Sequence, residues 1–357
     1  MALLPRKTSK ETRPVGLEIE AGSIAAAEVR VNGSTRVAAA GTVALPPDAF
    51  RDGEVRDPEV VAEGLRSLFA AHKLSTRVRL GIANSRVVVR TMRLPAIDDP
   101  KELAAAIRFT AAELIPMPLD QAVLDHRVVG GVPQTEGAPP QIDVMVVAAR
   151  RDMVTSFLQP LRDAGLEPVG VDLSAFAMIR AASQVQAPAE EQGAPAVLYC
   201  GVGDITNLAV AKGRSCLFTR VSPSGLDEIA ASLQSRTQLS AEHTRMWLNH
   251  VGLDQPVEAI EGDPTIVDAV RQALEQGAAG LIDEIRLSLD FYGTQESAVP
   301  VGRVVLCGPA TAIRGLSERL GPELGLPVSV ARPEALSEFD SASAARLTLP
   351  FGLALDD

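Results

Sequence analysis

The sequence has few of the features with which proteins coat nucleic acids or cross membranes. Phe, Trp and Tyr make up 3% of the 357 residues, too few for platforms on which bases stack. Acidic residues outnumber basic ones by 45 to 34, which gives a net charge of 34 − 45 = −11 and opposes binding to phosphate backbones. No apolar run approaches the ~20 residues of a membrane-spanning helix, and the charged start is unlike a signal peptide. We therefore expect a soluble, cytoplasmic protein that does not bind nucleic acid.

Metal-binding and disulfide patterns are also missing. The chain has three cysteines, Cys200, Cys216 and Cys307. Each is isolated within an apolar run, which predicts buried thiols rather than zinc ligands or a disulfide framework. His243 and His250 lie seven residues apart on a predicted helix, which is no metal-ligand spacing. We predict no metal site built from these residues.

What the sequence does contain is an alternation of strand and helix patterns, which indicates an α/β fold. At 46% apolar and 22% charged residues the composition is globular, and the length favours two or three domains at about 150 residues each. Strands are predicted at 15–19, 24–31 and 35–43, with an Asn32-Gly33 hairpin turn, and a helix at 58–72.

A similar strand pattern returns at residues 196–200, 205–211 and 215–221. Such a duplication predicts two similar halves with a ligand cleft between them; the alternative is a chance match between common hairpins. The segment between the two copies contains a helix ended by Pro116, strands at 123–129 and 142–148, and a helix over 153–161, which together suggest an inserted α/β domain. Residues 181–195 resemble a linker.

Three short segments are candidates for binding chemistry. The turn Gly201-Val-Gly-Asp204 has glycines that let backbone N–H groups approach a phosphate, although most such turns are plain hairpins. Gly308-Pro-Ala310 precedes a helix predicted to begin near Thr311, and a helix N-terminus favours an anion. Glu18 and Glu20 alternate on one strand and share a face, where they either hold magnesium through water or face solvent.

Several specific motifs resemble the PilM family of type IV pilus assembly proteins, which is related to the cell-division protein FtsA. The most specific are Ile115-Pro-Met-Pro-Leu-Asp120 and Ser288-Leu-Asp-Phe-Tyr292. Further matches are Leu94-Pro95, Val146-Val-Ala-Ala-Arg150, Asp172-Leu-Ser-Ala-Phe176, Glu284-Ile-Arg286 and Phe351-Gly-Leu-Ala-Leu355. The resemblance spans about residues 14–356.

The resemblance implies an actin-like ATPase fold, that is, a duplicated ribonuclease H-like fold with an FtsA/PilM-type insertion. The implied subdomains are a first core subdomain at 14–87 with 171–192 and 331–357, an inserted subdomain at 88–170, a second core subdomain at 193–225 with 300–330, and a helical capping subdomain at 226–299.

The resemblance also implies ATP and magnesium, held by two phosphate loops and an adenosine loop. The residues at those loops would be Glu18, Gly22, Ser23, Gly201, Gly203, Asp204, Thr206 and Gly308. All three loops depart from the family pattern. Glu20 replaces a glycine beside the phosphates, Cys200 stands at a usual aspartate, Pro309 replaces a second glycine, and Leu248 falls near a usual lysine. We therefore expect nucleotide binding that is weak or lost, and no catalytic residue is assigned.

The partner that the resemblance implies is the N-terminal cytoplasmic peptide of a PilN-type inner-membrane protein, bound between the first core subdomain and the insertion. A peptide can be captured by strand addition or in an apolar groove without catalytic residues. The main hypothesis is a pilus assembly scaffold at the inner membrane with other pilus assembly proteins. The alternative is an active actin-like ATPase whose nucleotide state gates partner binding. A sugar or acetate kinase is disfavoured because no substrate motif is present.

Overall fold

Two five-stranded sheets of the same topology form the body of the protein. The computed structural model describes residues 13–46, 48–131, 139–183, 194–295 and 298–355. The first sheet has the order β10-β6-β1-β2-β3 and the second has the order β13-β12-β11-β14-β15. In each, three consecutive antiparallel strands are extended on the far side by two parallel ones. The predicted duplication is thus confirmed.

The first three strands of each sheet agree with the sequence pattern to within a few residues. The first sheet consists of β1 (Val15–Glu20), β2 (Ser23–Asn32), β3 (Ser34–Ala44), β6 (Arg77–Ile82) and β10 (Glu167–Leu173). The second consists of β11 (Ala196–Val202), β12 (Thr206–Lys212), β13 (Ser215–Ser222), β14 (Val301–Cys307) and β15 (Val328–Val330). The β2–β3 turn contains Gly33 at φ +77°, a conformation in which glycine has no Cβ penalty.

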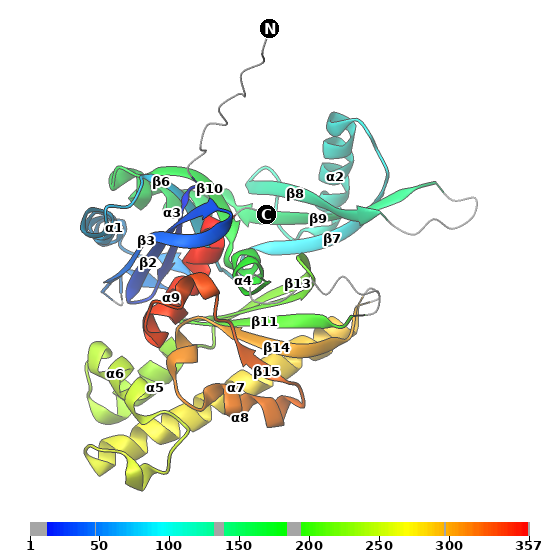
Figure 1. Cartoon of the computed structure of the whole chain (residues 1–357). Coiled ribbons are helices and arrows are strands. Elements are labelled where there is room, and N and C mark those ends of the chain that lie inside the picture. The colour runs from blue at the N-terminus through cyan, green and yellow to red at the C-terminus, as the bar shows by residue number, and fades with distance from the viewer. Residues whose placement is uncertain (1–12, 47, 132–138, 184–193, 296–297, 356–357) are drawn as a thin grey trace.

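Helices α4 (Ser174–Ser183) and α9 (Ser341–Ala354) lie between the two sheets (Figure 1). Met178 and Ile179 of α4 pack against Tyr199 and Ala209 of the second sheet. On the outer side of the first sheet lie α1 (Pro58–His72), whose N-cap is Asp57, and α3 (Arg151–Asp163). The small hairpin β4 (Phe50–Arg51) and β5 (Glu54–Val55) joins this lobe.

The outer side of the second sheet is covered by helices. These are α5 (Leu226–Thr237), α6 (Ala241–Val251), α7 (Pro264–Gly293) and α8 (Leu316–Leu324), with short 3-10 turns η1 (Val257–Ala259), η2 (Pro309–Ala312) and η3 (Glu334–Leu336) elsewhere in the chain. The helix predicted to begin near Thr311 is instead the turn η2, and α8 begins only at Leu316. Gly315, at φ +79°, separates the two.

A third sheet forms a unit of its own beside the two lobes. It has the order β7-β9-β8, from β7 (Val88–Pro95), β8 (Ala122–Gly131) and β9 (Gln141–Arg150), and α2 (Pro100–Leu114) packs on it. Its core includes Ile107, Ala111, Val144 and Val146. The predicted insertion at 88–170 is divided between two parts of the molecule. Strands β7, β8 and β9 with α2 form the third sheet unit, whereas α3 and β10 pack within the first lobe. There β10 pairs with β6, and Phe157 of α3 joins the first lobe's core.

The predicted linker at 181–195 is corrected at its start. Residues 181–183 belong to α4, where Ala181 and Ala182 are buried. Residues 184–193 lie outside the described part of the chain.

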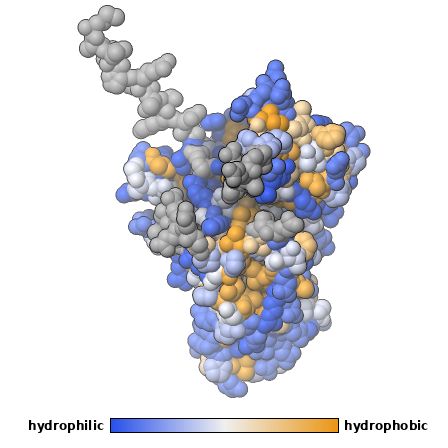
Figure 2. Space-filling model, turned by 90° about the vertical axis from the view of Figure 1, so that its right-hand side faces the viewer, coloured by the Kyte–Doolittle hydropathy of each residue, from blue (hydrophilic) through white to orange (hydrophobic). Residues whose placement is uncertain are grey.

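Among the helices that the structure describes, none combines the length and apolar character needed to cross a bilayer. On the face shown in Figure 2, hydrophobic side chains form a band through the middle of the molecule, and hydrophilic side chains cover most of its lower end.

Candidate functional site

The turns between the first two strands of each sheet meet where the two lobes face each other. The β1–β2 turn contains Ala21 and Gly22, and the β11–β12 turn contains Gly203 and Asp204. The Ala21 N–H donates a hydrogen bond to the Asp204 carboxylate. A Cβ on Gly203 would overlap the Glu20 carboxylate, so the side chain of Glu20 lies directly against the opposite turn. The two predicted phosphate loops therefore touch one another.

Six charged side chains surround this contact, and we call them the cleft cluster. They are Glu18, Glu20, Asp204, Asp227, Arg245 and Arg346. The acids come from β1, the β11–β12 turn and α5, whereas the arginines come from α6 and α9. With four acidic and two basic side chains, the cluster is acidic wherever its carboxyl groups ionise.

Arg245 joins the two lobes within the cluster. Its Nη2 donates to the Ala21 carbonyl oxygen at 2.5 Å in the first lobe. The same atom lies 3.5 Å from Oδ1 of Asp204 and 3.4 Å from Oδ1 of Asp227 in the second lobe. A Cβ on Gly22 would overlap the guanidinium, which would then have to shift. The φ of +79° at Gly22 is also a backbone conformation that favours glycine.

Burial shapes the protonation of the acids in the cluster. It raises the pKa of Glu18 well above its ordinary value, and the neighbouring Glu20 carboxylate adds to the rise while Arg346 opposes it. Burial also raises the pKa of Asp204 strongly, with Glu20 and Asp227 adding to the rise. The pKa of Glu20 is raised by burial against the opposing charges of Arg346 and Arg245. A desolvated group of like charges holds protons that isolated surface carboxyls release.

The sequence-predicted site residues fall into two groups. Glu18, Gly22, Ser23, Gly203 and Asp204 lie in or beside the cleft cluster. Glu18 is 8% exposed, so the alternative in which it faces solvent is wrong for this side chain. The Ser23 hydroxyl accepts a hydrogen bond from Arg346 at 2.8 Å.

The remaining three predicted residues lie away from the cluster. Gly201 is paired within the second sheet and packs near the sulfur of Met178 on α4. Thr206 is fully buried and lines a separate cavity of about 210 Å³ between the second sheet, α5 and α7. Its Oγ1 has no hydrogen-bond partner in the described residues. Gly308, at φ +84°, lies against the backbone of Val202 beside η2, which also borders that cavity.

Three members of the cluster, Asp227, Arg245 and Arg346, were missed by sequence reasoning. Leu248, which stands near the lysine of the family pattern, is 3% exposed and belongs to the core of the second lobe. Arg245 lies three residues earlier, which is the neighbouring position on the same side of α6. The helical part of the second lobe therefore does bring a cation to the cleft. Inspecting the sequence one helical turn to either side of Leu248 would have identified Arg245 as this cation.

The cysteines are buried, as predicted. Burial raises the pKa of both Cys200 and Cys216 to about 12. Within the described ranges, no group of three or more His, Cys, Asp or Glu side chains has an arrangement suited to a metal ion.

Comparison with known proteins identifies the family. The model of the family described as type IV pilus assembly protein PilM matches residues 16–351. The chain belongs to the PilM family. A solved structure of a PilM-PilN type IV pilus biogenesis complex is similar to this chain, with a TM-score of 0.78 and 26% identity. The match covers 96% of this chain and 97% of that one.

Two more distant structures share the fold alone. MreB5 of Spiroplasma citri bound to ADP has a TM-score of 0.55 at 11% identity, over 96% of this chain and 95% of that one. The ethanolamine utilization protein EutJ from Carboxydothermus hydrogenoformans has a TM-score of 0.52 at 16% identity, over 96% and 89%. This PilM-family protein therefore has the actin-like fold that its motifs predicted.

Proposed function

We propose that this PilM-family protein is a type IV pilus assembly scaffold that binds the cytoplasmic N-terminal tail of a PilN-type inner-membrane protein. The family membership and the similarity to a PilM-PilN complex support the pilus role and this kind of partner. Its place would be the cytoplasmic face of the inner membrane, reached through that partner. The proposed subdomains keep the predicted bounds, except that α3 and β10 are assigned to the first core subdomain.

The observation that carries the non-catalytic part of the proposal is the cleft cluster. Glu20 lies against Gly203, and Arg245 lies against Gly22, so protein side chains take up the space beside both glycines that a phosphate would need. Two like charges at ~4 Å repel by about 1 kcal/mol in water and by about 4 kcal/mol at an effective dielectric constant of 20. A triphosphate approaching Glu20 and Asp204 meets that repulsion wherever they are ionised.

The residues present do not fit ATP with magnesium in this arrangement. Binding would require Arg245 to leave Ala21 and both of its acidic partners, and the Glu20 side chain to move from the Gly203 turn. We therefore propose that the nucleotide loops are degenerate and that hydrolysis is weak or lost.

The alternative, an ATPase whose nucleotide state gates the partner, is favoured by two specific observations. Arg245 and Arg346 are cations at the cleft, and a cavity of about 210 Å³ lies beside Thr206 and η2, next to the Gly308 loop that the resemblance assigns to adenosine. In that case both arginines would turn to the phosphates and the lobes would part.

Calorimetric titration with ATP, with and without magnesium, separates the two functions. The scaffold predicts no heat of binding at micromolar concentrations and no phosphate release. Micromolar affinity together with turnover that Glu18→Ala abolishes would overturn the scaffold. Glu20→Gly restores the glycine of the family pattern and is expected to strengthen nucleotide binding, whereas Glu59→Gly, at an exposed position on α1, serves as the control for loss of one surface carboxylate.

A further inference from the structure

The hairpin of β2 and β3 ends in a tip that projects from the first lobe. Every residue from Arg30 to Ser34 is exposed, and Val31 keeps 43% of its surface accessible. At the tip, Arg30 of β2 stands directly opposite Arg36 of β3 in the strand register. Residues placed in this way share a face of the hairpin, with Cβ atoms about 5 Å apart. Two like charges therefore lie side by side at this end of the first sheet.

No acid in the described part of the chain pairs with either arginine. Lys73, the C-cap of α1, is likewise exposed and has no ion pair there. It belongs to the same corner of the lobe, because the Ser75 N–H and hydroxyl donate to the Glu28 carboxylate of β2 at 3.0 and 2.8 Å. These two bonds occupy Glu28, which lies two residues before Arg30 on the same face. We call the following four residues the basic tip: Arg30, Val31, Arg36 and Lys73.

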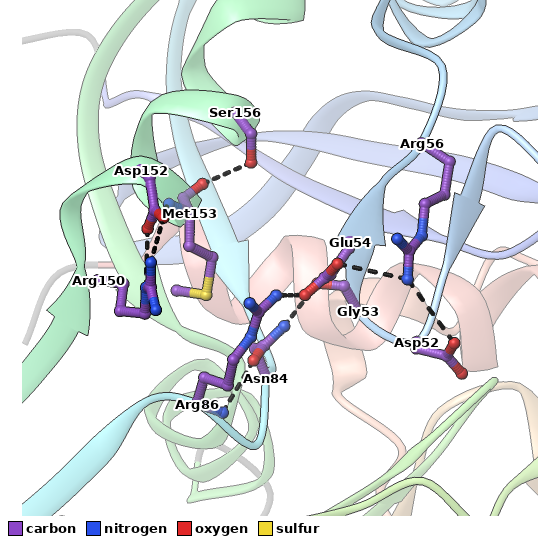
Figure 3. Close-up of polar contacts among 10 residues, drawn as sticks. All are labelled: Asp52, Gly53, Glu54, Arg56, Asn84, Arg86, Arg150, Asp152, Met153 and Ser156. Atoms are coloured by element: carbon purple, nitrogen blue, oxygen red, sulfur yellow. Dashed lines mark hydrogen bonds and ion pairs between the residues drawn. The ribbon is translucent and has the colours of Figure 1, made fainter. Parts of the chain in front are cut away.

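The arginines around the β4–β5 hairpin, in contrast, have acidic partners, as Figure 3 shows. Arg86 pairs with Glu54, and Arg56 lies 3.3 Å from the same carboxylate. Arg150 donates to Asp152 at 3.1 Å. Like charges directly opposite each other in a sheet are destabilising, so the arginine pair of the basic tip lowers the stability of the free protein. An anionic partner from outside the molecule explains the pair better than folding does.

The shape and composition of the basic tip indicate which anionic partner fits. A small anion is held by polar groups that converge in a hollow, whereas this tip projects and its neighbours are exposed. The headgroups of an anionic bilayer form an extended surface, at which each Arg or Lys strengthens binding about fivefold. Val31 is apolar and adjoins Arg30, so it can enter the interface while the long basic side chains stay at the headgroups.

The chain enters the first sheet at this same end. Gly16 of β1 pairs with Ala27 of β2, so the residues before Val15 join the sheet beside the end of β2. Residues 1–12 lie outside the described part of the chain, and their sequence contains Leu3, Leu4, Arg6, Lys7 and Lys10 against a single acid, Glu11. In a chain of net charge −11, basic and apolar residues are thus concentrated in the segment that precedes this end.

We propose that the basic tip contacts an anionic lipid bilayer directly, with its three cations at the headgroups and Val31 in the interface. This goes beyond the proposed function, in which the partner alone brings the protein to the membrane. Stable attachment of a peripheral protein takes two signals, and the basic tip supplies a second one. It also orients the first lobe with the β2–β3 turn toward the lipid.

The test uses the full chain and lipid vesicles, with no partner protein present. One preparation contains phosphatidylcholine and phosphatidylglycerol in equal amounts, and the other contains phosphatidylcholine alone. Sedimentation over a series of lipid concentrations compares the wild type with Arg30→Gln/Arg36→Gln. The control, Arg51→Gln/Arg56→Gln, removes the same charge from exposed arginines whose partners are Asp48 and Glu54.

The wild type is expected to bind the anionic vesicles and not the neutral ones, and to bind less as salt screens the charges. The double substitution at the basic tip is expected to weaken this binding by about 25-fold, whereas the control should bind as the wild type does. Because the substitution removes a like-charge pair, the tip variant should unfold at no lower urea concentration than the wild type.

A second measurement locates the contact. The native cysteines are buried, so a nitrobenzoxadiazole dye can be attached selectively to Val31→Cys. Its emission is expected to shift to shorter wavelength with anionic vesicles. The same dye on Met246→Cys, at an apolar position of α6 that is 62% exposed, should show no shift.

Three results would overturn the proposal. The wild type may not bind anionic vesicles at all, the two double variants may bind them equally well, or the dye at position 31 may not shift. Binding to polyglutamate without binding to vesicles would assign the basic tip to an acidic protein segment instead of lipid. Since no partner protein is present, each of these results leaves the proposed function standing.

Discussion

Replacing Arg245 by methionine tests whether the cleft cluster holds the lobes together. The substitution keeps a long side chain but removes the donor to Ala21 and the partner of Asp204 and Asp227. Arg245 is 29% exposed and Asp204 is 12% exposed, so the pair is only partly screened by solvent. A hydrogen bond to a charged group contributes about 1.5–3 kcal/mol, and a buried carboxyl left without its cation adds to that cost. We expect a loss of about 2–3 kcal/mol in the free energy of unfolding.

A matched control separates this effect from the loss of any ion pair. Arg66 pairs with Glu63 at 2.8 Å, but these side chains are 48% and 73% exposed, and such surface pairs contribute about 0–1 kcal/mol. Urea denaturation followed by circular dichroism gives both free energies. A loss for Arg245→Met no larger than that for Arg66→Met would refute the claim that Arg245 joins the lobes.

Two further predictions follow from burial. Burial raises the pKa of Glu20. Between the ordinary and the raised pKa, the folded state therefore retains a proton that the unfolded state has released. The resulting stabilisation of the folded state is present at low pH and is lost as pH rises through the raised pKa. The wild type should therefore lose more stability than Glu20→Gln between pH 5 and pH 8 in urea titrations, and equal losses would contradict the burial of this carboxyl. Burial raises the pKa of Cys200 and Cys216 to about 12. A disulfide reagent at pH 8 should therefore label neither thiol in the folded protein and both thiols in urea. Rapid labelling without denaturant would show that the second sheet opens.

The duplicated sheets could be predicted from the sequence because their first three strands are local hairpins. The Asn32-Gly33 turn and the apolar alternation on either side of it need no information from distant residues. The placement of α3 and β10 could not be predicted in the same way. β10 pairs in parallel with β6 across more than eighty residues of chain, and nothing in the local pattern tells a strand of the first sheet from a strand of the third.

The candidate site was predictable only in part, for a related reason. The turns that carry Gly22, Gly203 and Asp204 follow from the hairpins, so their meeting follows from the duplication. The cations that surround them come from α6 and α9, far away in the sequence, and an arginine on an amphipathic helix is ordinarily a solvated side chain.

A scaffold with degenerate nucleotide loops binds its partner in the same way whether or not nucleotide is present. The most direct test uses a fluorescein-labelled peptide with the sequence of the N-terminal tail of the PilN-type protein. Its affinity for the full chain is measured by anisotropy with no nucleotide, with ADP and with ATP, each nucleotide at millimolar concentration with magnesium. We predict dissociation constants that agree within about twofold in all three conditions. A change of tenfold or more with ATP that Glu18→Ala abolishes would contradict the scaffold and establish the gated ATPase instead.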